Sequence, residues 1–128
     1  MTTGSIYGTG VDLTTVARIA TVHARHSRRF VTRLLHPAER TAIRNVKDPA
    51  RFLAKAFAAK EAFVKALGTG FRGIAHSDVG LRRDKLGRPE LVFSPALKRR
   101  LEKLGVAHSH VSLSDEGDLV CAMVVLEK

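Results

Sequence analysis

The sequence predicts an α+β fold, with an antiparallel sheet packed against helices in a single small domain over residues 1–128. Segments with strand patterns and segments with helix patterns are mixed, without the regular alternation of a parallel βαβ fold. The chain also closes with two strand-like segments around a short polar turn, which is typical of an antiparallel hairpin. A length of 128 residues suits one domain with a modest core.

The N-terminal third contains one predicted strand and two predicted helical segments. Residues 6–13 are rich in glycine and β-branched residues, and we expect a strand that ends near Asp12. A helix capped by Thr14 or Thr15 follows, and it stops before a second helical segment at residues 28–35.

The clearest helix lies between Asp48 and Gly68. Asp48 is a good N-terminal cap, Pro49 suits the first helical position and Gly68 suits the C-terminal stop. At about 100° per residue, one broad side of this helix is apolar. That side comprises Phe52, Leu53, Ala56, Phe57, Ala59, Phe63, Val64, Ala66 and Leu67.

The C-terminal half is predicted to be mostly strands. Residues 77–83 and 90–93 flank a turn that contains glycine and proline. A helix between a serine cap and a glycine stop is expected over residues 94–105. The closing hairpin pairs residues 109–114 with residues 119–126.

The net charge of +10 is concentrated early in the chain. Between residues 18 and 51, nine basic residues are opposed by only two acidic ones. Such a surface expects an anionic partner, although a solvated basic face without a specific partner is an alternative. A basic nucleic-acid-binding module is therefore the main rival function. Aromatic residues are only 5% and tryptophan is absent, which argues against a base-stacking platform for single strands.

Cysteine content and hydropathy indicate the compartment. Cys121 is the only cysteine, so an internal disulfide is impossible, and a reducing cytoplasm fits. No apolar run approaches the roughly 18–20 residues of a membrane span. Residues 1–4 lack a basic segment and no long apolar segment follows them, so we expect no secretory signal and a cytoplasmic protein without membrane contact.

Three charged residues of the long helix are candidates for chemistry. Lys60 falls inside the apolar arc, where a lysine is costly unless it is paired or extends its ammonium group to solvent. Glu61 lies at the edge of the arc and Lys65 follows it by four residues. Glu61 and Lys65 could form an ordinary surface pair. Alternatively, Glu61 is a half-buried carboxylate that holds a hard cation or accepts a proton.

Asp12 and His110 are the other candidates. Asp12 lies where a strand gives way to a helix, so it either caps that helix or binds a ligand. Asp12 and Glu61 together would suit magnesium, which typically takes one or two protein carboxylates besides waters and phosphate. His110 shares a polar strand face with Ser112 and Ser114, and it could hydrogen-bond a phosphate or relay a proton.

Three segments stand out in order along the chain: residues 6–13 (IYGTGVDL), residues 51–62 (RFLAKAFAAKEA) with KALGTG at residues 65–70, and residues 110–116 (HVSLSDE). Together they resemble the holo-acyl-carrier-protein synthase family. The glycine-arginine-proline turn at residues 87–89 is similar to a turn of the same family. The resemblance covers almost the whole chain, and its middle motif is highly specific.

The resemblance implies an enzyme that transfers 4′-phosphopantetheine from coenzyme A to a carrier-protein serine, releasing adenosine 3′,5′-bisphosphate, with magnesium as cofactor. It implies a role in fatty acid biosynthesis. Asp12 and Glu61 match the family's two metal-binding carboxylates. Lys65 matches a lysine near the transferred phosphate, and His110 matches a histidine of the site. Together with Arg51, these last two form the expected coenzyme A-binding set. The proton acceptor for the carrier serine is Glu61 first and Lys65 second.

The resemblance also implies an assembly and a partner. Family members of this length are usually homotrimers, with active sites between adjacent subunits. Their basic first helix receives the acidic acyl carrier protein, so Arg18, Arg25 and Arg28 are the expected docking residues. The chain departs from the family at Ala56, where many members have arginine, and at Thr15, where many have glutamate. Neither departure touches the expected metal pair.

Overall fold

The computed structural model describes residues 5–128. The expectation that the chain lacks a secretory signal concerns residues 1–4, which lie outside the described residues. The elements in chain order are β1 (Ile6–Thr15), α1 (Val16–Leu34), α2 (Pro37–Ala42), η1 (Ile43–Asn45), α3 (Pro49–Leu67), η2 (His76–Asp78), β2 (Val79–Arg83), β3 (Pro89–Phe93), α4 (Pro95–Leu104), β4 (His108–Glu116) and β5 (Leu119–Glu127).

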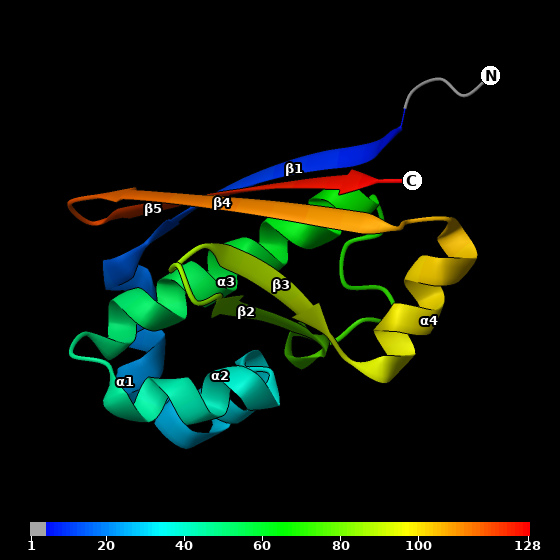
Figure 1. The fold of residues 1–128 in the computed structure, drawn as a ribbon. Helices are drawn as coiled ribbons and strands as arrows, with labels where there is room; N and C mark the ends of the chain where they lie inside the picture. Colours follow the sequence, from blue (N-terminus) through cyan, green and yellow to red (C-terminus); the bar gives the residue numbers. More distant parts are fainter. Residues whose placement is uncertain (1–4) are drawn as a thin grey trace.

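The strands form two antiparallel sheets. The larger has the order β1-β5-β4, and the smaller pairs β2 with β3. Figure 1 shows α3 crossing beneath the three-stranded sheet, with the β2–β3 hairpin, α1 and α2 on the other side of that helix. The predicted α+β class with antiparallel pairing is therefore confirmed, although the strands divide between two sheets.

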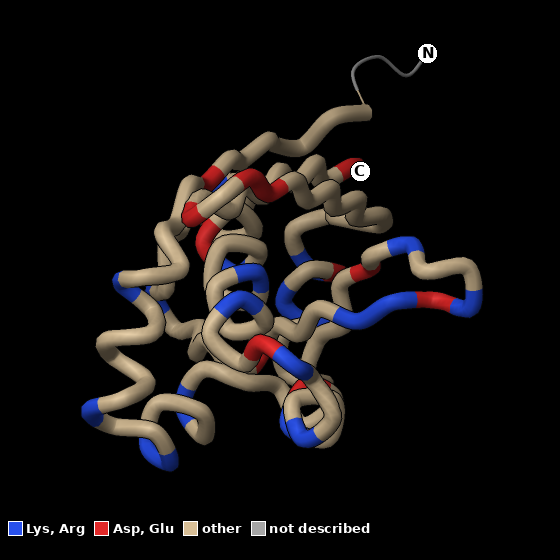
Figure 2. Tube along the Cα trace, turned by 90° about the vertical axis from the view of Figure 1, so that its left-hand side faces the viewer, with Lys and Arg blue, Asp and Glu red and all other residues tan. Residues whose placement is uncertain are grey.

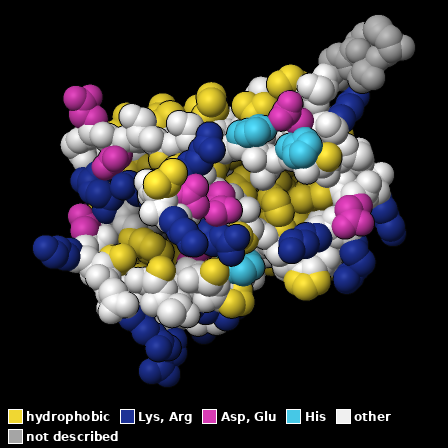
Figure 3. Space-filling model, viewed as in Figure 1, with side chains coloured by type: hydrophobic (Ala, Val, Ile, Leu, Met, Phe, Trp, Pro, Cys, Tyr) yellow, Lys and Arg dark blue, Asp and Glu magenta, His cyan; other side chains and the backbone are white. Residues whose placement is uncertain are grey.

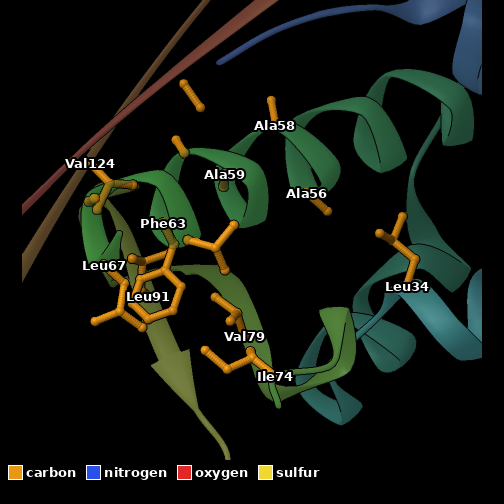
Figure 4. Packing of buried hydrophobic residues seen from close by; sticks show 14 of the residues in the cluster. Leu34, Ala56, Ala58, Ala59, Phe63, Leu67, Ile74, Val79, Leu91 and Val124 are labelled. Carbon is orange, nitrogen blue, oxygen red and sulfur yellow. The ribbon is translucent and has the colours of Figure 1, made fainter. Parts of the chain in front are cut away.

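The helix α3 is the centre of the core. Its apolar side packs toward the smaller sheet, where Figure 4 shows Phe63, Leu67 and Leu91 lying together beneath the helix. A second side of α3 is also buried, at Ala54, Ala58 and Ala62, which lie outside the predicted arc. Because α3 lies between two layers, it buries residues on two sides.

Two glycines of β1 allow this close packing. A Cβ atom at Gly10 would lie 2.0 Å from the carbonyl oxygen of Ala62, and one at Gly8 would lie 2.0 Å from that of Ala66. Real Cβ atoms do not approach oxygen this closely, so only glycine fits at these positions. The glycines bring the backbone of β1 against α3, and this contact places Asp12 beside the polar edge of the helix.

The helix boundaries agree with the predicted caps. The side chain of Thr15 accepts a hydrogen bond from the Arg18 amide and begins α1. The two predicted helical segments join into this one helix across a kink at His26. Asp48 caps α3, and Gly68 ends it with a φ of 84°, a left-handed conformation that glycine adopts readily.

Three boundaries differ from the sequence expectations. β1 continues past Asp12 to Thr15, so Asp12 lies within the strand and pairs with Ala122. Residues 76–78 form a short 3₁₀ turn before β2 rather than strand. In the closing hairpin, strand pairing extends to Glu116, which leaves a two-residue turn. In β1 and β4, pairing with β5 extends each strand beyond the alternating apolar residues on which the prediction relied.

Lys60 is fully buried and paired. Its ammonium group lies 2.6 Å from a carboxylate oxygen of Glu39, which is also buried, and it donates to the carbonyl oxygen of Val79. Burial lowers the pKa of Lys60, and the charge of Glu39 opposes that shift. The other oxygen of Glu39 accepts from the Leu81 amide. The pair therefore joins α2, α3 and β2, and Lys60 does not extend to solvent.

Within residues 5–128, no helix combines the length and apolar character that crossing a membrane requires.

Candidate functional site

The candidate site lies along β1, which is an edge strand of the larger sheet. The Lys65 ammonium group donates to the Val11 carbonyl oxygen at 3.0 Å and lies 3.3 Å from Oδ1 of Asp12. The hydroxyl of Thr14 donates to the other Asp12 oxygen at 2.8 Å. Asp12 is thus oriented by two neighbours from α3 and from its own strand.

Glu61 lies one helical turn before Lys65 on α3. Burial raises the pKa of Glu61, the neighbouring negative charge of Asp12 raises it further, and Lys65 and Arg18 act in the opposite direction. The structure therefore brings Asp12, Glu61, Lys65 and Arg18 into one electrostatic cluster. Lys65 pairs with Asp12 and not with Glu61, which excludes the simple surface pair that helical spacing allowed.

Arg18 belongs to this cluster as much as to the docking surface expected for it. Its guanidinium lies over the ring of Phe57, 5.5 Å from the centroid. Phe57 stands one turn before Glu61 on α3, so the cation–π contact holds α1 against the site.

His76 is a member of the site that the sequence analysis missed. Its Nε2 lies 3.8 Å from Oε2 of Glu61. Its ring stacks on Phe71 with centroids 3.8 Å apart, and lies nearly parallel to Phe57 at 5.9 Å. Burial, and secondarily the charge of Lys60, lowers the pKa of His76. No motif carries this contact, because it depends on how the connection after α3 folds back.

His110 lies apart from the cluster within one chain. It is on β4, the opposite edge strand, and it pairs with Val125 on the face of the sheet that points away from α3. Its Nε2 is 2.6 Å from Oε1 of Glu127. His110 and Arg88 line a hollow of about 340 Å³ between β3 and β4. The single chain therefore does not join His110 to Asp12 and Glu61.

Arg51 has intramolecular partners. Its guanidinium lies 2.8 Å from Oδ2 of Asp115 and donates to the carbonyl oxygen of Gly117 at 2.7 Å. These bonds fasten the first turn of α3 to the β4–β5 turn. The expected contact of Arg51 with coenzyme A stays a prediction, and it would require these bonds to be exchanged.

The other expected docking residues, Arg25 and Arg28, are exposed on α1. In Figure 2, Lys and Arg are spread along the outer helices, while several acidic positions gather at one end of the three-stranded sheet. Figure 3 shows Lys and Arg side chains spread over the left, centre and right of its view as well as at its lower edge. The basic residues border the acidic end of the sheet, where Arg51 pairs with Asp115.

The face of the three-stranded sheet that points away from α3 is open, with apolar side chains along β1 and β5 and polar ones along β4. Val11 is 55% exposed, Leu13 is 61% exposed and Met123 is 48% exposed. His110 lies on the same face, because it alternates along β4 with the inward-facing Val111. An exposed apolar sheet face of this kind is typical of a surface that meets another protein.

Asp12 and Glu61 are the two carboxylates that could contribute to a metal site. Among the described residues, no group of three or more His, Cys, Asp or Glu side chains could hold a metal ion. Two adjacent carboxylates suit magnesium, however, since that ion keeps several waters and binds substrate phosphate. The raised pKa of Glu61 supports this fit, because part of it reflects repulsion from Asp12 that a cation would relieve.

Ala56, where many family members have arginine, is buried and lines a hollow of about 330 Å³ between α2, α3 and β2. Glu39 lines the same hollow. A longer cationic side chain at position 56 would enter this space and approach the carboxylate that Lys60 already occupies. That location favours a structural pair over a coenzyme A contact for the missing arginine.

Comparison with known proteins places the chain in a family. The sequence matches the model of the 4′-phosphopantetheinyl transferase superfamily over residues 8–124. A holo-[acyl-carrier-protein] synthase of Thiobacillus denitrificans is 48% identical over 124 residues, covering 96% of this chain and 95% of that protein.

Solved structures agree with this match. The crystal structure of holo-[acyl-carrier-protein] synthase from Neisseria meningitidis has a TM-score of 0.93 at 43% identity, covering 96% of this chain and 99% of that one. A holo-(acyl-carrier-protein) synthase from Bacillus anthracis, solved in complex with CoA (3′,5′-ADP), has a TM-score of 0.80 at 31% identity, covering 97% and 98%. The resemblance of the three sequence motifs is confirmed over nearly the full chain, and the protein belongs to the 4′-phosphopantetheinyl transferase superfamily.

Proposed function

We propose that this chain is a holo-acyl-carrier-protein synthase. It transfers 4′-phosphopantetheine from coenzyme A to a serine of apo acyl carrier protein, giving holo carrier and adenosine 3′,5′-bisphosphate. The observation that carries the proposal is the meeting of Asp12, Glu61 and Lys65 at the edge of β1, in a chain of this superfamily. The relative from Bacillus anthracis, solved in complex with CoA (3′,5′-ADP), supports coenzyme A as the donor.

Transfer of a phosphoryl-type group requires positioning and neutralisation of phosphate charge more than covalent chemistry from the protein. Asp12 and Glu61 are the residues that would hold magnesium, and the ion, when bound, would neutralise charge on the phosphate oxygens. Lys65 adds a mobile positive charge. Its ammonium group now bonds the Val11 carbonyl, and its flexible stem allows the group to reach a phosphate oxygen instead.

The carrier serine must lose its proton during attack. Glu61 is the first candidate acceptor, because its carboxylate belongs to the same cluster as Asp12 and Lys65, where the phosphate would be held. Lys65 is the second candidate. We expect Glu61→Gln, which preserves size and helix propensity, to reduce transfer at least about 100-fold. Activity within a few-fold of wild type in a folded variant would remove Glu61 from the chemistry.

His110 enters the same site if a second copy of the chain supplies it. The open apolar face that carries His110 also carries Val11 and Leu13, the neighbours of Asp12 in β1. A homotrimer in which adjacent copies pack through this face would bring His110 of one subunit toward Asp12 and Glu61 of the next. His110 and Arg88 would then offer positive charge to the phosphates of coenzyme A.

The acidic carrier protein would dock on α1, through Arg25 and Arg28, with Arg18 at the border between docking surface and site. Such an enzyme would act in the cytoplasm and supply carrier for fatty acid biosynthesis. The positive charge of the first third of the chain then serves an acidic protein and the phosphates of coenzyme A.

The test combines the purified protein with coenzyme A, apo carrier and magnesium, and follows the carrier by mass spectrometry. We expect the mass to rise by one phosphopantetheine group, and the reaction to stop with excess chelator. Full modification in chelator would refute the metal role alone. No modification under any condition, with tight and salt-sensitive DNA binding instead, would favour a nucleic-acid-binding module.

A further inference from the structure

His76 occupies a position that the proposed reaction leaves unexplained. It follows α3 by nine residues, yet it returns to the helix and faces Glu61 at 3.8 Å. Four planar groups form a column there. The guanidinium of Arg18 lies over Phe57, Phe57 lies nearly parallel to His76, and His76 stacks closely on Phe71. The column joins α1, α3, η2 and the connection after α3.

The column fixes the imidazole more firmly than it fixes the carboxylate. The ring of His76 lies nearly parallel to two other rings, with centroids 3.8 Å away for Phe71 and 5.9 Å away for Phe57. Glu61 has three side-chain torsions and is only partly buried, so its carboxylate can leave the direction of Asp12 unless a neighbour restrains it. The Nε2 of His76, at 3.8 Å, is the nearest such neighbour, and a small movement of the Glu61 side chain would bring the two into hydrogen-bonding distance. Residues that hydrogen-bond metal ligands orient those ligands.

We propose that His76 is a positioning residue for Glu61, and that the stacked column holds it in place so that the Glu61 carboxylate stays directed toward the cation shared with Asp12. The inference rests on the proposed metal-dependent function. It assigns to His76 no contact with substrate and no proton transfer. Removal of its nitrogen should therefore weaken cation binding and lower kcat, while KM for the carrier should change little.

Two substitutions separate the nitrogen from the ring. His76→Phe keeps a flat ring for the column and removes Nε2. His76→Gln places an amide near the position of Nε2 and sacrifices the stacking. We measure Mn²⁺ binding to each variant in the presence of coenzyme A by electron paramagnetic resonance of free Mn²⁺. We expect His76→Phe to weaken Mn²⁺ about tenfold, the usual scale for loss of a residue that orients a metal ligand, and His76→Gln to recover most of it.

Two further variants make the result decisive. His23→Phe makes the same side-chain change on α1 and should leave Mn²⁺ affinity unchanged. Glu61→Gln should abolish tight Mn²⁺ binding. If Glu61→Gln binds Mn²⁺ like wild type, the proposed metal site is wrong, and the proposed positioning role of His76 is overturned with it. If Glu61→Gln loses Mn²⁺ while His76→Phe keeps wild-type affinity, only the role of His76 is overturned. Equal losses in His76→Phe and His76→Gln, with lowered thermal stability, would reduce His76 to a structural stacking residue.

Discussion

Glu61 is held in an environment that opposes its charge. It is partly buried, the negative charge of Asp12 lies nearby, and the cations Lys65 and Arg18 offset these effects only in part, so the pKa of Glu61 is raised. A native state that raises a carboxyl pKa binds that proton more tightly than the unfolded chain does. Glu61 therefore costs folding stability when it is ionised and no metal is bound, as expected of a residue retained for its chemistry.

This cost predicts a dependence of stability on pH. The contribution of Glu61 is fully present below its unfolded pKa and is lost as pH rises through the raised folded pKa. In chelator, Glu61→Gln should therefore melt above wild type at about pH 7.5, with a smaller difference at about pH 5. Thermal unfolding followed by circular dichroism tests this. Glu102→Gln, at an exposed position of α4, is the control and should show no such pH-dependent gain. A Glu61→Gln variant less stable than wild type at both pH values would contradict the electrostatic account.

The residues of this site were only partly predictable. Glu61 could be found because it stands at the edge of an apolar arc, which is a local feature of the sequence. Asp12 could be found from an expected strand end, although the structure extends that strand beyond it. The partner of Lys60 could not be predicted, because Glu39 is 21 positions away and contacts Lys60 only when α2 packs on α3. The contact of His76 with Glu61 likewise depends on tertiary folding.

At the scale of elements, the contact between α3 and β1 determines how the site residues are placed. The caps of α3 and its first apolar side were predicted, because caps and helical periodicity are local. Its second buried side was not, since alanines indicate close packing only when the opposing glycines of β1 are known. The site depends on this packing, which sets the separation of Asp12 from Lys65 and Glu61.

Gly10→Ala should therefore damage both fold and site. The new methyl group would collide with the carbonyl oxygen of Ala62, which is backbone and cannot rotate away. We expect a loss of about 2–3 kcal/mol in the free energy of unfolding, the range of forced overpacking, measured by urea denaturation. Thr9→Ala, at the neighbouring exposed position of β1, should change stability by less than about 0.5 kcal/mol. Similar small changes for both variants would show that β1 can move away from α3 without cost.

The helix α1 is the element proposed to receive the carrier. Arg18 is a poor probe of docking because it also contacts Phe57, so Arg25→Glu and Arg28→Glu are the better substitutions. We expect each to raise KM for the carrier about tenfold with KM for coenzyme A unchanged, since charges at an interface rim act mainly on association. Lys103→Glu on α4 reverses an exposed charge elsewhere and should have little effect.

Salt provides a second measurement of the same docking. Raising salt from about 50 to about 300 mM should weaken carrier use by wild type more than by the α1 variants, because screening acts on an attraction that the variants lack. If Arg25→Glu and Arg28→Glu have the same KM for the carrier as wild type, α1 is not part of the docking surface.

At the scale of the whole molecule, the sequence predicted the antiparallel α+β class but not the division into two sheets. Strand patterns show which face of a strand is apolar, while the choice of neighbour is made by contacts distant in sequence, such as β1 with β5. The open face of the β1-β5-β4 sheet is a related case. Val11, Leu13 and Met123 are large apolar residues, yet the single chain leaves them exposed.

If copies of the chain pack through that open face, two variants that are inactive alone should recover transfer activity when they are mixed in one trimer. Glu61→Gln disables one half of a shared site, and His110→Ala disables the other half. The two residues lie on separate surfaces of a single chain. In a cyclic assembly with head-to-tail interfaces, equal mixing would give about one quarter of the interfaces both intact halves. After unfolding and refolding together, the mixture should therefore regain about one quarter of wild-type transfer activity.

Each variant refolded alone should stay inactive. Leu13→Glu, which charges the open face, should prevent both the recovery of activity and the formation of the trimer, which light scattering detects. No recovery in a mixture shown to contain mixed trimers would place Glu61 and His110 in separate functions, and recovery by a monomer would exclude a site shared between subunits.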